Sequence, residues 1–409
     1  MPAFRNTWYI RNVINRNDDR ALVDTALTRS PIVLLVGPRQ AGKSTLARAV
    51  AASSPISSFF DLEDPHHAER LTDPSMALSD LSGLVVIDEA QHAPLLFPVL
   101  RVLADRPHRP ATFLVLGSAS PDVIGLAAES LAGRVEIVEL GGLRISDVGA
   151  PAIEQLWLQG SLPASFTRAG DDSLAWRNGY VTTFLERDLS ELGFRLPSTQ
   201  MRRFWTMLAH YHAQTWNGAE LARALGVSQP TTRRYLDALT DALMVRQLQP
   251  WYANVGKRVM RSPKVYLRDS GVLHTLLGLK TMNGLLDHPK VGASWEGFVV
   301  EQVAMTLPST PLHFWGTQSG AELDVLFVHD GRSIGVEIKR TTTPKLTPSI
   351  RHAITDLGLH HVFVIYPGAD RYPMADRVEA LPLSTLAEPH FSWDRADVHS
   401  GHEAVRPES

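Results

Sequence analysis

Short apolar runs in the first third of the chain are each followed by glycines or polar residues, the pattern of buried strands that end in loops. They lie in the stretches "PIVLLVGPRQAGKST", "SGLVVIDEAQ" and "ATFLVLGSAS", and a helical stretch, "TLARAVAAS", follows the first. Strands that alternate with helices are typical of an α/β domain, which we expect over residues 1–150.

Helical spacing replaces the strand pattern in the middle of the chain. Apolar and charged residues alternate at this spacing over residues 174–210. Pro197 is a clear breaker within this stretch, so we expect more than one helix. The pattern predicts a helical connector or lid over residues 151–212.

Two helices and a wing are predicted next, within residues 213–290. The first helix runs from Gly218 to Leu225 and ends at Gly226. Ser228 can cap the second helix, and Pro230 falls in its first turn. The apolar positions fit a helix-turn-helix, and "MVRQLQPWYANVGKRVMRSPKVYL" then predicts strand, loop and strand.

A hairpin is predicted in "ELDVLFVHDGRSIGVEIKR", where two apolar runs are joined by Asp-Gly, a preferred pair for a tight turn. If that pair forms the turn, His329 faces Arg332 and, counting back along both strands, Asp324 faces Glu337. Facing residues have Cβ atoms about 5 Å apart and share one side of the sheet. Lys339, two residues beyond Glu337, shares that side.

The C-terminal part is predicted to be a second α/β domain, over residues 291–370. "VGASWEGFVVEQVAMTL" predicts an amphipathic helix before the hairpin, and "SIRHAITDLGLHHVFVIYP" predicts a helix and a strand after it. Residues 371–409 are expected to hold a last short strand, around 378–383, and a mobile tail.

Composition narrows the class of protein. The chain has 409 residues, 44% of them hydrophobic and 20% charged, which indicates a folded protein of two to four domains. It contains neither a long apolar run nor an apolar signal-peptide centre, so we expect a cytoplasmic protein without a membrane partner. Cysteine is absent, which excludes disulfides and thiolate ligands. A net charge of −3 means that nucleic-acid binding would need local basic patches.

The first strand leads directly into a glycine-rich motif that binds phosphate. Gly37, four further residues and then Gly42-Lys43-Ser44 form the P-loop pattern between a strand and a helix. Its backbone N–H groups would surround ATP phosphates, Lys43 would reach the β- and γ-phosphates, and Ser44 would ligate Mg²⁺. The predicted nucleotide-binding residues are Gly37, Pro38, Arg39, Gln40, Ala41, Gly42, Lys43, Ser44 and Thr45.

Two acids follow the second strand, at the edge where the P-loop also lies. Asp88 is predicted to hold Mg²⁺ and Glu89 to polarise the water that attacks the γ-phosphate. Ser118, just past the third strand, could contact the γ-phosphate or could be an ordinary turn residue.

These motifs together resemble the AAA+ superfamily. "YIRNVINR", "LLVGPRQAGKSTLAR", "VVIDEAQ", "FLVLGSAS", "SLAGRVEIVEL" and "YVTTFLERDL" occur in this order between residue 8 and about residue 190. The chain resembles in particular the bacterial and archaeal ATPases with a C-terminal region of unknown function, the AAA_14 plus DUF4143 type.

The resemblance implies an arginine finger at Arg134, supplied across a subunit interface of a homo-oligomer. A surface salt bridge is the alternative for this residue. Arg187 in "LERDL" is a second candidate, and it ranks below Arg134 because the chain shows no clear second sensor motif.

Basic residues concentrate in the predicted helix-turn-helix and wing. Six of them and no acid occur between residues 246 and 268, which suits a nucleic-acid backbone, and we expect this nucleic acid to be DNA. Winged helices also serve as protein-interaction modules, so this assignment rests partly on fold analogy. The predicted DNA-binding residues are Arg233, Arg234, Lys257, Arg258 and Arg261.

The predicted hairpin carries a candidate metal site. Two facing carboxylates repel unless a cation lies between them, and their hard oxygens suit Mg²⁺ or Mn²⁺. Asp324, Glu337 and Lys339 thereby resemble the core of a PD-(D/E)XK nuclease, over residues 291–368. In such nucleases an acid on the preceding helix lies near the metal, which implies Glu296, with Glu301 in reserve. Leu323 stands where that family often has proline.

Two kinds of function remain open from the sequence. The first is an ATP-hydrolysing AAA+ protein that acts on DNA, with a Mg²⁺-dependent nuclease-like site. The second is an ATP-switched regulator or scaffold, of a signalling or toxin–antitoxin type, whose nuclease-like domain only binds. Asp324, Glu337 and Lys339 could also be a salt-bridged cluster at a strand end.

Overall fold

The computed structural model describes residues 13–108, 110–118, 121–251, 261–318, 320–389 and 391–394. The chain forms two compact units, the first comprising Met1–Gln249 and Arg261–Pro308 and the second Pro250–Met260 and Ser309–Ser409. Within the described ranges, no helix is long and apolar enough to span a membrane.

A parallel sheet at the start of the first unit confirms the predicted α/β domain. Its strands lie in the order β2-β3-β4-β1-β5, and all neighbouring pairs are parallel. The P-loop strand therefore lies beside β4 and β5. The strands are β1 (Ile32–Gly37), β2 (Ser57–Asp61), β3 (Gly83–Asp88), β4 (Ala111–Ser118) and β5 (Val135–Glu139).

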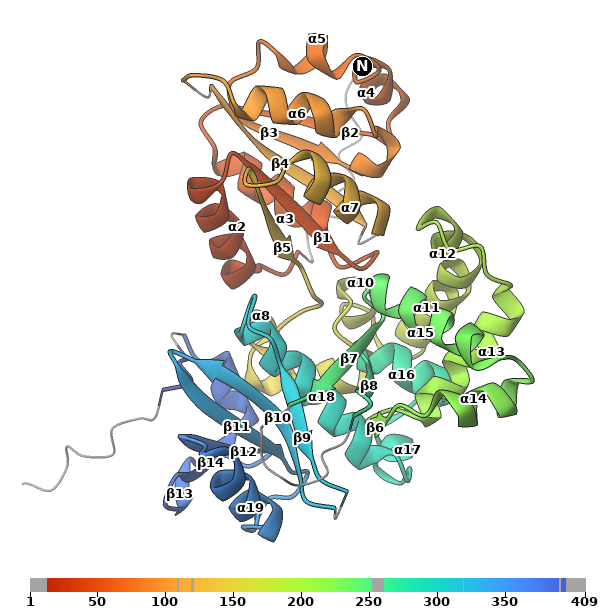
Figure 1. Ribbon diagram of the computed structural model, residues 1–409, viewed down its shortest axis with the longest axis vertical. Coiled ribbons are helices and arrows are strands. Elements are labelled where there is room, and N and C mark those ends of the chain that lie inside the picture. Colours follow the sequence, from red (N-terminus) through yellow and green to blue (C-terminus); the bar gives the residue numbers. More distant parts are fainter. Residues whose placement is uncertain are drawn as a thin grey trace, which may run out of the picture. The chain divides into compact units, whose positions relative to one another are not determined.

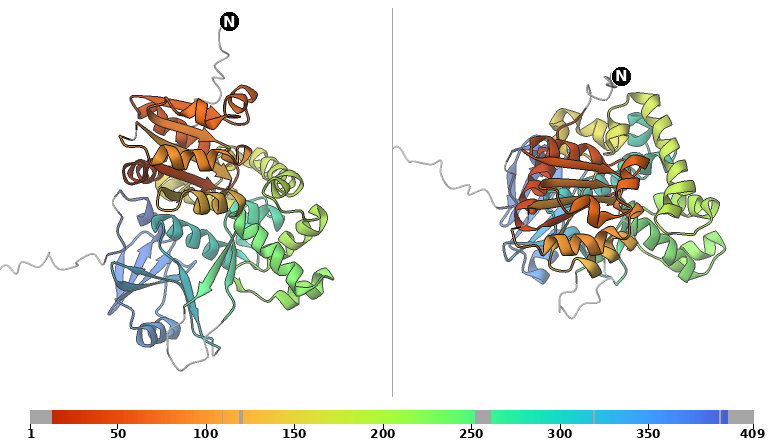
Figure 2. Two further views of the ribbon diagram at one scale, coloured as in Figure 1. Left: turned by 45° about the horizontal axis from the view of Figure 1, so that its top comes forward. Right: turned by 90° about the horizontal axis from the view of Figure 1, so that it is seen from above.

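Helices cover both faces of this sheet (Figures 1 and 2), as the fully buried strand β1 requires. Ile32 and Leu34 pack toward α6 (Leu96–Ala104), whereas Val33 and Leu35 pack toward α2 (Asn17–Arg29) and α3 (Lys43–Ser53). The remaining elements of this domain are α4 (Pro65–Arg70), α5 (Pro74–Leu78), η1 (Ala90–His92) and α7 (Pro121–Ser130).

A helical region follows the sheet, as predicted. Its longest helix, α11 (Gly170–Thr183), continues into a π-helical turn, η3 (Phe184–Asp188). The other elements are α8 (Ile145–Val148), η2 (Ala150–Ala152), α9 (Ile153–Gln159), α10 (Pro163–Phe166), α12 (Leu189–Glu191) and α13 (Ser198–His210), which begins after Pro197.

The two helices predicted next have the expected bounds and caps. Gly226 ends α14 (Gly218–Leu225) in a left-handed conformation, and the Ser228 side chain accepts a hydrogen bond at the start of α15 (Gln229–Asp241). Strand β8 (Lys264–Leu267) pairs antiparallel with β6 (Gln214–Thr215) and β7 (Val245–Pro250). One hydrophobic core joins these helices to α11 and α13.

Helix α18 (Val291–Thr306) has the predicted position, but the prediction that it is amphipathic was wrong. Residues 297–303 are buried without interruption, so no face of this stretch is left to solvent. The reason is tertiary: α18 packs within the first unit, where it follows α16 (Ser270–Leu276) and α17 (Met282–Leu286). Ser294 and Gln302 of α18 form hydrogen bonds with residues 143, 145, 157 and 274, as donors or as acceptors.

The second unit holds a mixed sheet in the order β13-β14-β12-β11-β10-β9. Strand β11 pairs antiparallel with β10 and parallel with β12. Helix α19 packs on this sheet through Ile350 and Ala353. The elements are β9 (His313–Gly316), β10 (Glu322–His329), β11 (Arg332–Ile338), α19 (Pro348–Leu357), β12 (His361–Tyr366), β13 (Tyr372–Ala375), β14 (Val378–Pro382) and η4 (Leu383–Ala387).

The predicted hairpin is confirmed in turn and register. Asp330 and Gly331 have φ values of 46° and 75°, as a two-residue hairpin turn with two positive φ angles requires. Pairs run from His329 with Arg332 to Val325 with Val336, and the Asp324 position comes next. The C-terminal strand expected around 378–383 is β14, and β13, which the sequence pattern did not predict, pairs with it.

Candidate functional site

The P-loop connects β1 to α3 as the motif predicts. Gly42, the residue before α3, has a φ of 93°, a region that favours glycine. A Cβ on Gly37 would lie 2.4 Å from the Leu140 carbonyl oxygen, which explains the first glycine of the motif. Gln40 also has a positive φ, 64°. These positions therefore require a tight backbone path that favours glycine at both ends of the loop.

Lys43 lies buried inside this loop. Its ammonium donates to the carbonyl oxygens of Gly37 at 3.0 Å and Pro38 at 3.1 Å. Burial lowers the pKa of Lys43, and the negative charges of Glu89 and Asp88 oppose that shift. A phosphate in the loop would give this ammonium an anionic partner in place of two neutral carbonyls.

Asp88 and Ser44 lie together at the carboxyl end of β3. The Ser44 side chain hydrogen-bonds to the Asp88 carboxylate, which is also reached by the Glu89 N–H at 3.0 Å. Burial raises the pKa of Asp88, while the hydrogen bond from Ser44 lowers it. A hydroxyl and a carboxylate side by side are the hard oxygen ligands that Mg²⁺ prefers, so these residues fit the predicted metal.

Glu89, the predicted catalytic acid, has a strained backbone. Its φ and ψ are 55° and 47°, a left-handed conformation that costs a residue other than glycine roughly 1–2 kcal/mol. Such strain is concentrated at functional turns. The Glu89 carboxylate accepts a hydrogen bond from the Gln91 side chain, which holds it beside Asp88. On β4, the Ser118 backbone pairs with Gly37; its side chain lies outside the described structure.

The P-loop is tied to the helical region through Arg39. Its guanidinium pairs with Asp188 at 3.0 Å and with Glu191. Glu191 also pairs with Arg187, the second finger candidate, at 2.5 Å. Asp188 is the last residue of the π-helical turn, a geometry that often marks functional positions. Neither acid was predicted, although Asp188 belongs to "LERDL" and Glu191 follows that motif by two residues.

Arg134, the candidate finger, lies just before β5 and forms a bidentate ion pair within its own chain. Its Nε lies 2.6 Å and its Nη2 2.9 Å from the two carboxylate oxygens of Asp105. This hydrogen bonding to Asp105 raises the pKa of Arg134. A contact with the nucleotide of a neighbouring subunit would require the pair with Asp105 to open.

The basic stripe predicted between residues 246 and 268 is corrected by the structure. Arg246 and Arg268 bind Glu301, and the buried Lys264 binds Glu296, so half of the six basic residues are engaged by acids of α18. Among the predicted DNA contacts, Arg233, Arg234 and Arg261 are exposed, and Arg233 pairs with Asp237 at 3.0 Å. Lys257 and Arg258 lie outside the described residues.

In the second unit the hairpin gathers the predicted metal-site residues. Asp324 accepts a hydrogen bond from the Ile338 N–H at 2.8 Å, so its carboxylate reaches across to β11 beside Glu337. Lys339 donates to Glu337 at 2.6 Å. Glu337 is buried, and β10 has a register irregularity between Leu323 and Leu326 that flanks Asp324. Two carboxylates and one ammonium thus share a small region of the sheet.

The two acids proposed for the preceding helix bind residues of the first unit. Glu296 accepts hydrogen bonds from Lys264 at 3.0 Å and Tyr266 at 2.6 Å. Burial alone would raise the pKa of Glu301, but Arg246 and Arg268 outweigh it and hold that pKa below its usual value. A metal-binding role for Glu296 stays a prediction.

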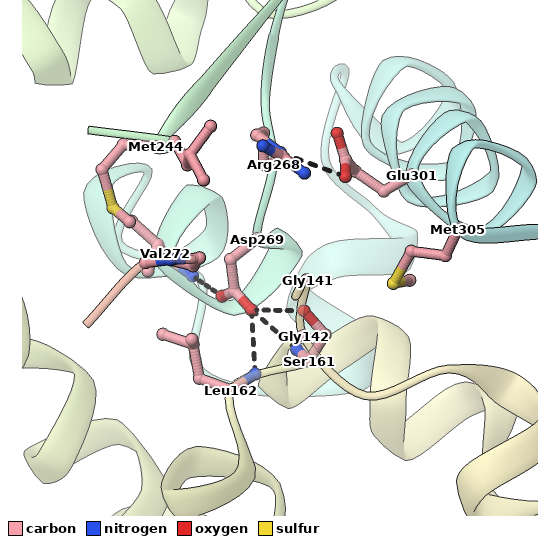
Figure 3. A pocket seen from close by; sticks show the side chains of 12 residues that line it. Gly141, Gly142, Ser161, Leu162, Met244, Arg268, Asp269, Val272, Glu301 and Met305 are labelled. Atoms are coloured by element: carbon pink, nitrogen blue, oxygen red, sulfur yellow. Dashed lines mark hydrogen bonds and ion pairs between the residues drawn. The ribbon is translucent and has the colours of Figure 1, made fainter. Parts of the chain in front are cut away.

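Pro38 of the P-loop is one of the residues that line a pocket in the first unit, and Figure 3 shows the side chains that line it. Asp269 accepts hydrogen bonds from the N–H groups of Ser161 at 2.7 Å and Leu162 at 3.2 Å, and caps α16 at the Val272 N–H. The Asp269 carboxylate therefore fastens the 161–162 loop to α16 next to the P-loop.

Two mycobacterial proteins are similar to this chain over most of its length. "Uncharacterized protein Rv2008c" of Mycobacterium tuberculosis and "Uncharacterized protein Mb2031c" of Mycobacterium bovis are each 60% identical to it over 375 residues, covering 91% of this chain and 85% of theirs. This chain belongs to their family. Family models match it as an AAA domain over residues 29–148, and as domains of unknown function, DUF8612 over residues 150–283 and DUF4143 over residues 291–386.

Solved structures similar to this family member include the Walker-type ATPase PABY2304 of Pyrococcus abyssi, with 15% identity and a TM-score of 0.46. That similarity covers 66% of this chain and 97% of the other. A single-residue variant of RuvB from Thermotoga maritima has 18% identity and a TM-score of 0.28, with coverages of 66% and 96%.

The family matches confirm the coarse prediction from the sequence. The AAA domain coincides with the predicted P-loop α/β domain, and the DUF4143 match confirms the resemblance to ATPases with that C-terminal region. The similarity to AAA domains is that expected of a protein that binds and hydrolyses ATP. The winged helix-turn-helix and the nuclease-like site stay predictions for this family member.

Proposed function

We propose that the chain binds ATP with Mg²⁺ at the P-loop and hydrolyses it. The observation that supports this most directly is the Ser44–Asp88 hydrogen bond next to the buried ammonium of Lys43. These groups are a hydroxyl, a carboxylate and a cation, and the backbone N–H groups of the loop would add hydrogen-bond donors to a phosphate. Bound Mg²⁺, held by Ser44 and Asp88, would neutralise phosphate charge.

Each residue has a separate task in this proposal. Lys43 leaves the carbonyls of Gly37 and Pro38 and binds the β- and γ-phosphates, where it stabilises the charge of the transition state. The N-terminus of α3 adds its positive dipole. Glu89 orients the attacking water and accepts its proton. Arg134 would complete the site of a neighbouring subunit in a homo-oligomer.

Measurement of ATP binding and ATP turnover separates these tasks. Lys43→Ala should weaken binding and reduce hydrolysis by orders of magnitude, since it removes the cation. Glu89→Gln should keep binding and lose turnover, because the amide is not a base. Arg20→Met is the control, because Arg20 forms an exposed ion pair with Asp24 on α2. Unchanged turnover in Lys43→Ala would exclude this site.

For the second unit we propose a metal-dependent phosphodiesterase site that acts on DNA. The supporting observation is the approach of Asp324 to the Glu337 strand through the Ile338 N–H, with Lys339 beside Glu337. Two carboxylates can hold Mg²⁺ or Mn²⁺, and an ammonium next to them can stabilise the charge that develops on a phosphodiester.

A regulator or scaffold is the second candidate, and two observations favour it. Lys339 already neutralises Glu337, and three of the six basic residues predicted to face DNA bind acids of α18. In that case the second unit binds a partner without cutting it, and ATP occupancy of the first unit acts as the switch.

One experiment decides between the two candidates. Labelled duplex, single-stranded and branched DNA are incubated with Mg²⁺ or Mn²⁺, with and without ATP. A nuclease should cut at least one substrate, and Asp324→Ala and Lys339→Ala should abolish cutting. Asp376→Ala, which removes an exposed acid from the turn between β13 and β14, should cut like the wild type. Uncut DNA, together with an ATP turnover rate that is the same with and without DNA, would favour the regulator.

A further inference from the structure

Arg16, the last residue of "YIRNVINR", lies buried against the P-loop. Its side chain is 6% exposed, and its Nη1 donates to the Ala41 carbonyl oxygen at 2.8 Å. Its Nη2 donates to the carbonyl oxygens of Gly142 at 2.7 Å and Gly141 at 3.1 Å. One guanidinium therefore joins the P-loop to the segment that follows β5.

That segment also contacts the beginning of the P-loop. The Leu140 N–H donates to Val36 at 2.8 Å, and the Leu140 carbonyl occupies the space that a side chain on Gly37 would need. Gly142 is equally confined, because a Cβ there would lie 2.0 Å from the Ser161 hydroxyl oxygen. Residues 140–142 thus provide a fixed surface to which Arg16 fastens the far end of the loop.

Two carboxylates hold the Arg16 guanidinium in place. Asp19 lies 2.7 Å from its Nη2, and Asp147 lies 3.7 Å from its Nε. Arg144 pairs with the other oxygen of Asp19, so two arginines face two carboxylates in this buried cluster. Buried charges are tolerated when they are paired in this way. The cluster fixes the direction in which Arg16 presents its donors.

We propose that Arg16 is a positioning residue for ATP, which orients the peptide between Ala41 and Gly42 so that the Gly42 N–H faces the phosphates. A trans peptide is planar, and its C=O and N–H point in opposite directions. Because the Ala41 C=O points to Arg16, the Gly42 N–H points away from Arg16. This inference rests on the proposed ATP site and adds the residue that prepares one of its donors.

An arginine suits this task better than a lysine. Arg16 donates hydrogen bonds to three carbonyl oxygens and forms ion pairs with two carboxylates. This requires a planar group with several donors in fixed directions. A lysine keeps the charge but has one nitrogen, and it cannot span the distance between the P-loop and residues 141–142 in the same way. Arg16→Lys therefore removes the bridge while it preserves the charge balance.

The test is direct measurement of ATP affinity, by calorimetry or with a fluorescent ATP analogue, together with kcat and KM. We expect the Kd of Arg16→Lys for ATP to rise about tenfold, as the loss of about 1.4 kcal/mol implies. KM should rise similarly, while kcat should change by less than about threefold, because the Gly42 donor serves both ground and transition states. Equal Kd values for Arg16→Lys and wild type would overturn the inference.

Arg144→Lys is the matched control within the same cluster. Arg144 pairs with Asp19, and the P-loop contact that Arg16 makes is left in place. Arg144→Lys should bind ATP within about threefold of wild type, even where both variants lower Tm equally. Equal loss of affinity in both variants would mean that the cluster only stabilises the fold, and would overturn a positioning role.

Two further comparisons keep the result unambiguous. Arg16→Gln provides the test if Arg16→Lys does not fold, because a single amide cannot donate to Ala41 and to residues 141–142 at once; a loss of affinity of about tenfold or more supports the inference, and affinity equal to wild type overturns it. Wild type and Lys43→Ala separate this inference from the proposed function. Wild type without ATP binding contradicts the proposed function itself, whereas normal binding in both wild type and Arg16→Lys contradicts only the role of Arg16.

Discussion

The P-loop leaves no room for a side chain at Gly37. A Cβ at this position would lie 2.4 Å from the Leu140 carbonyl oxygen, a backbone atom that cannot rotate away. We expect Gly37→Ala to lower the free energy of unfolding by about 1–3 kcal/mol, the usual cost of overpacking. Urea unfolding of the wild type and of Gly37→Ala measures this difference in the free energy of unfolding. In the control Gly125→Ala, on α7, the new Cβ meets nothing within 4 Å, and stability should stay equal or rise.

Asp147, beside Arg16, should make stability depend on pH. Burial raises its pKa from 3.8 to about 6, so the folded protein holds this proton more tightly than the unfolded chain does. The carboxyl therefore favours folding below about pH 4, and that contribution is lost as the pH rises to 6. A shift of about two pH units corresponds to about 3 kcal/mol.

Asp147→Asn isolates this contribution. Asparagine does not titrate, and its oxygen can still accept the hydrogen bond that Asp147 receives from the Arg144 N–H at 2.8 Å. Urea unfolding of both proteins at pH 4, 5, 6 and 7 gives the difference between them. We expect wild type to lose up to about 3 kcal/mol relative to the variant between pH 4 and pH 7. A difference independent of pH would contradict the raised pKa.

At the scale of elements, Asp269 connects α16 to the loop that precedes α10. It caps α16 and accepts two N–H groups from residues 161 and 162. Asp269→Ala should lower the free energy of unfolding by about 4 kcal/mol, because it removes one helix cap and leaves two partly buried N–H donors without an acceptor. Asp64→Ala, which removes only the cap of α4 at the His66 N–H, should cost about 1 kcal/mol. Similar losses in both variants would contradict this connecting role.

The hairpin β10–β11 was the element best predicted by local sequence. Asp-Gly is a preferred pair for a two-residue turn in which both φ angles are positive, and Asp330 and Gly331 have such angles. A two-residue turn fixes the register of both strands. Helix α18 was predicted in position but not in environment. Side chains from distant parts of the chain surround α18, and the hydrophobic pattern of the helix itself does not indicate that they will bury it.

At the scale of the whole molecule, Arg134 tests whether subunits share an ATP site. Arg134→Ala should lose ATP turnover by a factor of about 10³ or more if it acts as a finger. Mixing Arg134→Ala with Lys43→Ala subunits should restore turnover. In the mixture, the intact P-loop of an Arg134→Ala subunit can lie next to the intact Arg134 of a Lys43→Ala subunit. Asp105→Ala keeps the arginine and removes its ion-pair partner, so it should stay active. No recovery on mixing, or an active Arg134→Ala monomer, would contradict the shared site.

The sequence by itself determined the parts of this protein that depend on neighbours along the chain. The P-loop, the acids after β3, the caps of α14 and α15 and the hairpin turn are local, since each conformation is specified within a few residues. The AAA domain and the DUF4143 region were identified for the same reason, from motifs in a fixed order.

Only the tertiary structure decided which charges meet. Arg246, Lys264 and Arg268 form part of a basic stripe in the sequence, yet the fold pairs them with acids of α18, and Arg16 reaches Ala41 and Gly142 across 25 and 126 residues. The physical reason is that the sequence does not show whether a charged side chain is solvated by water or paired with an oppositely charged residue far along the chain. Its partner is selected by packing, because burial makes an unpaired charge costly and distant segments supply the counter-charge.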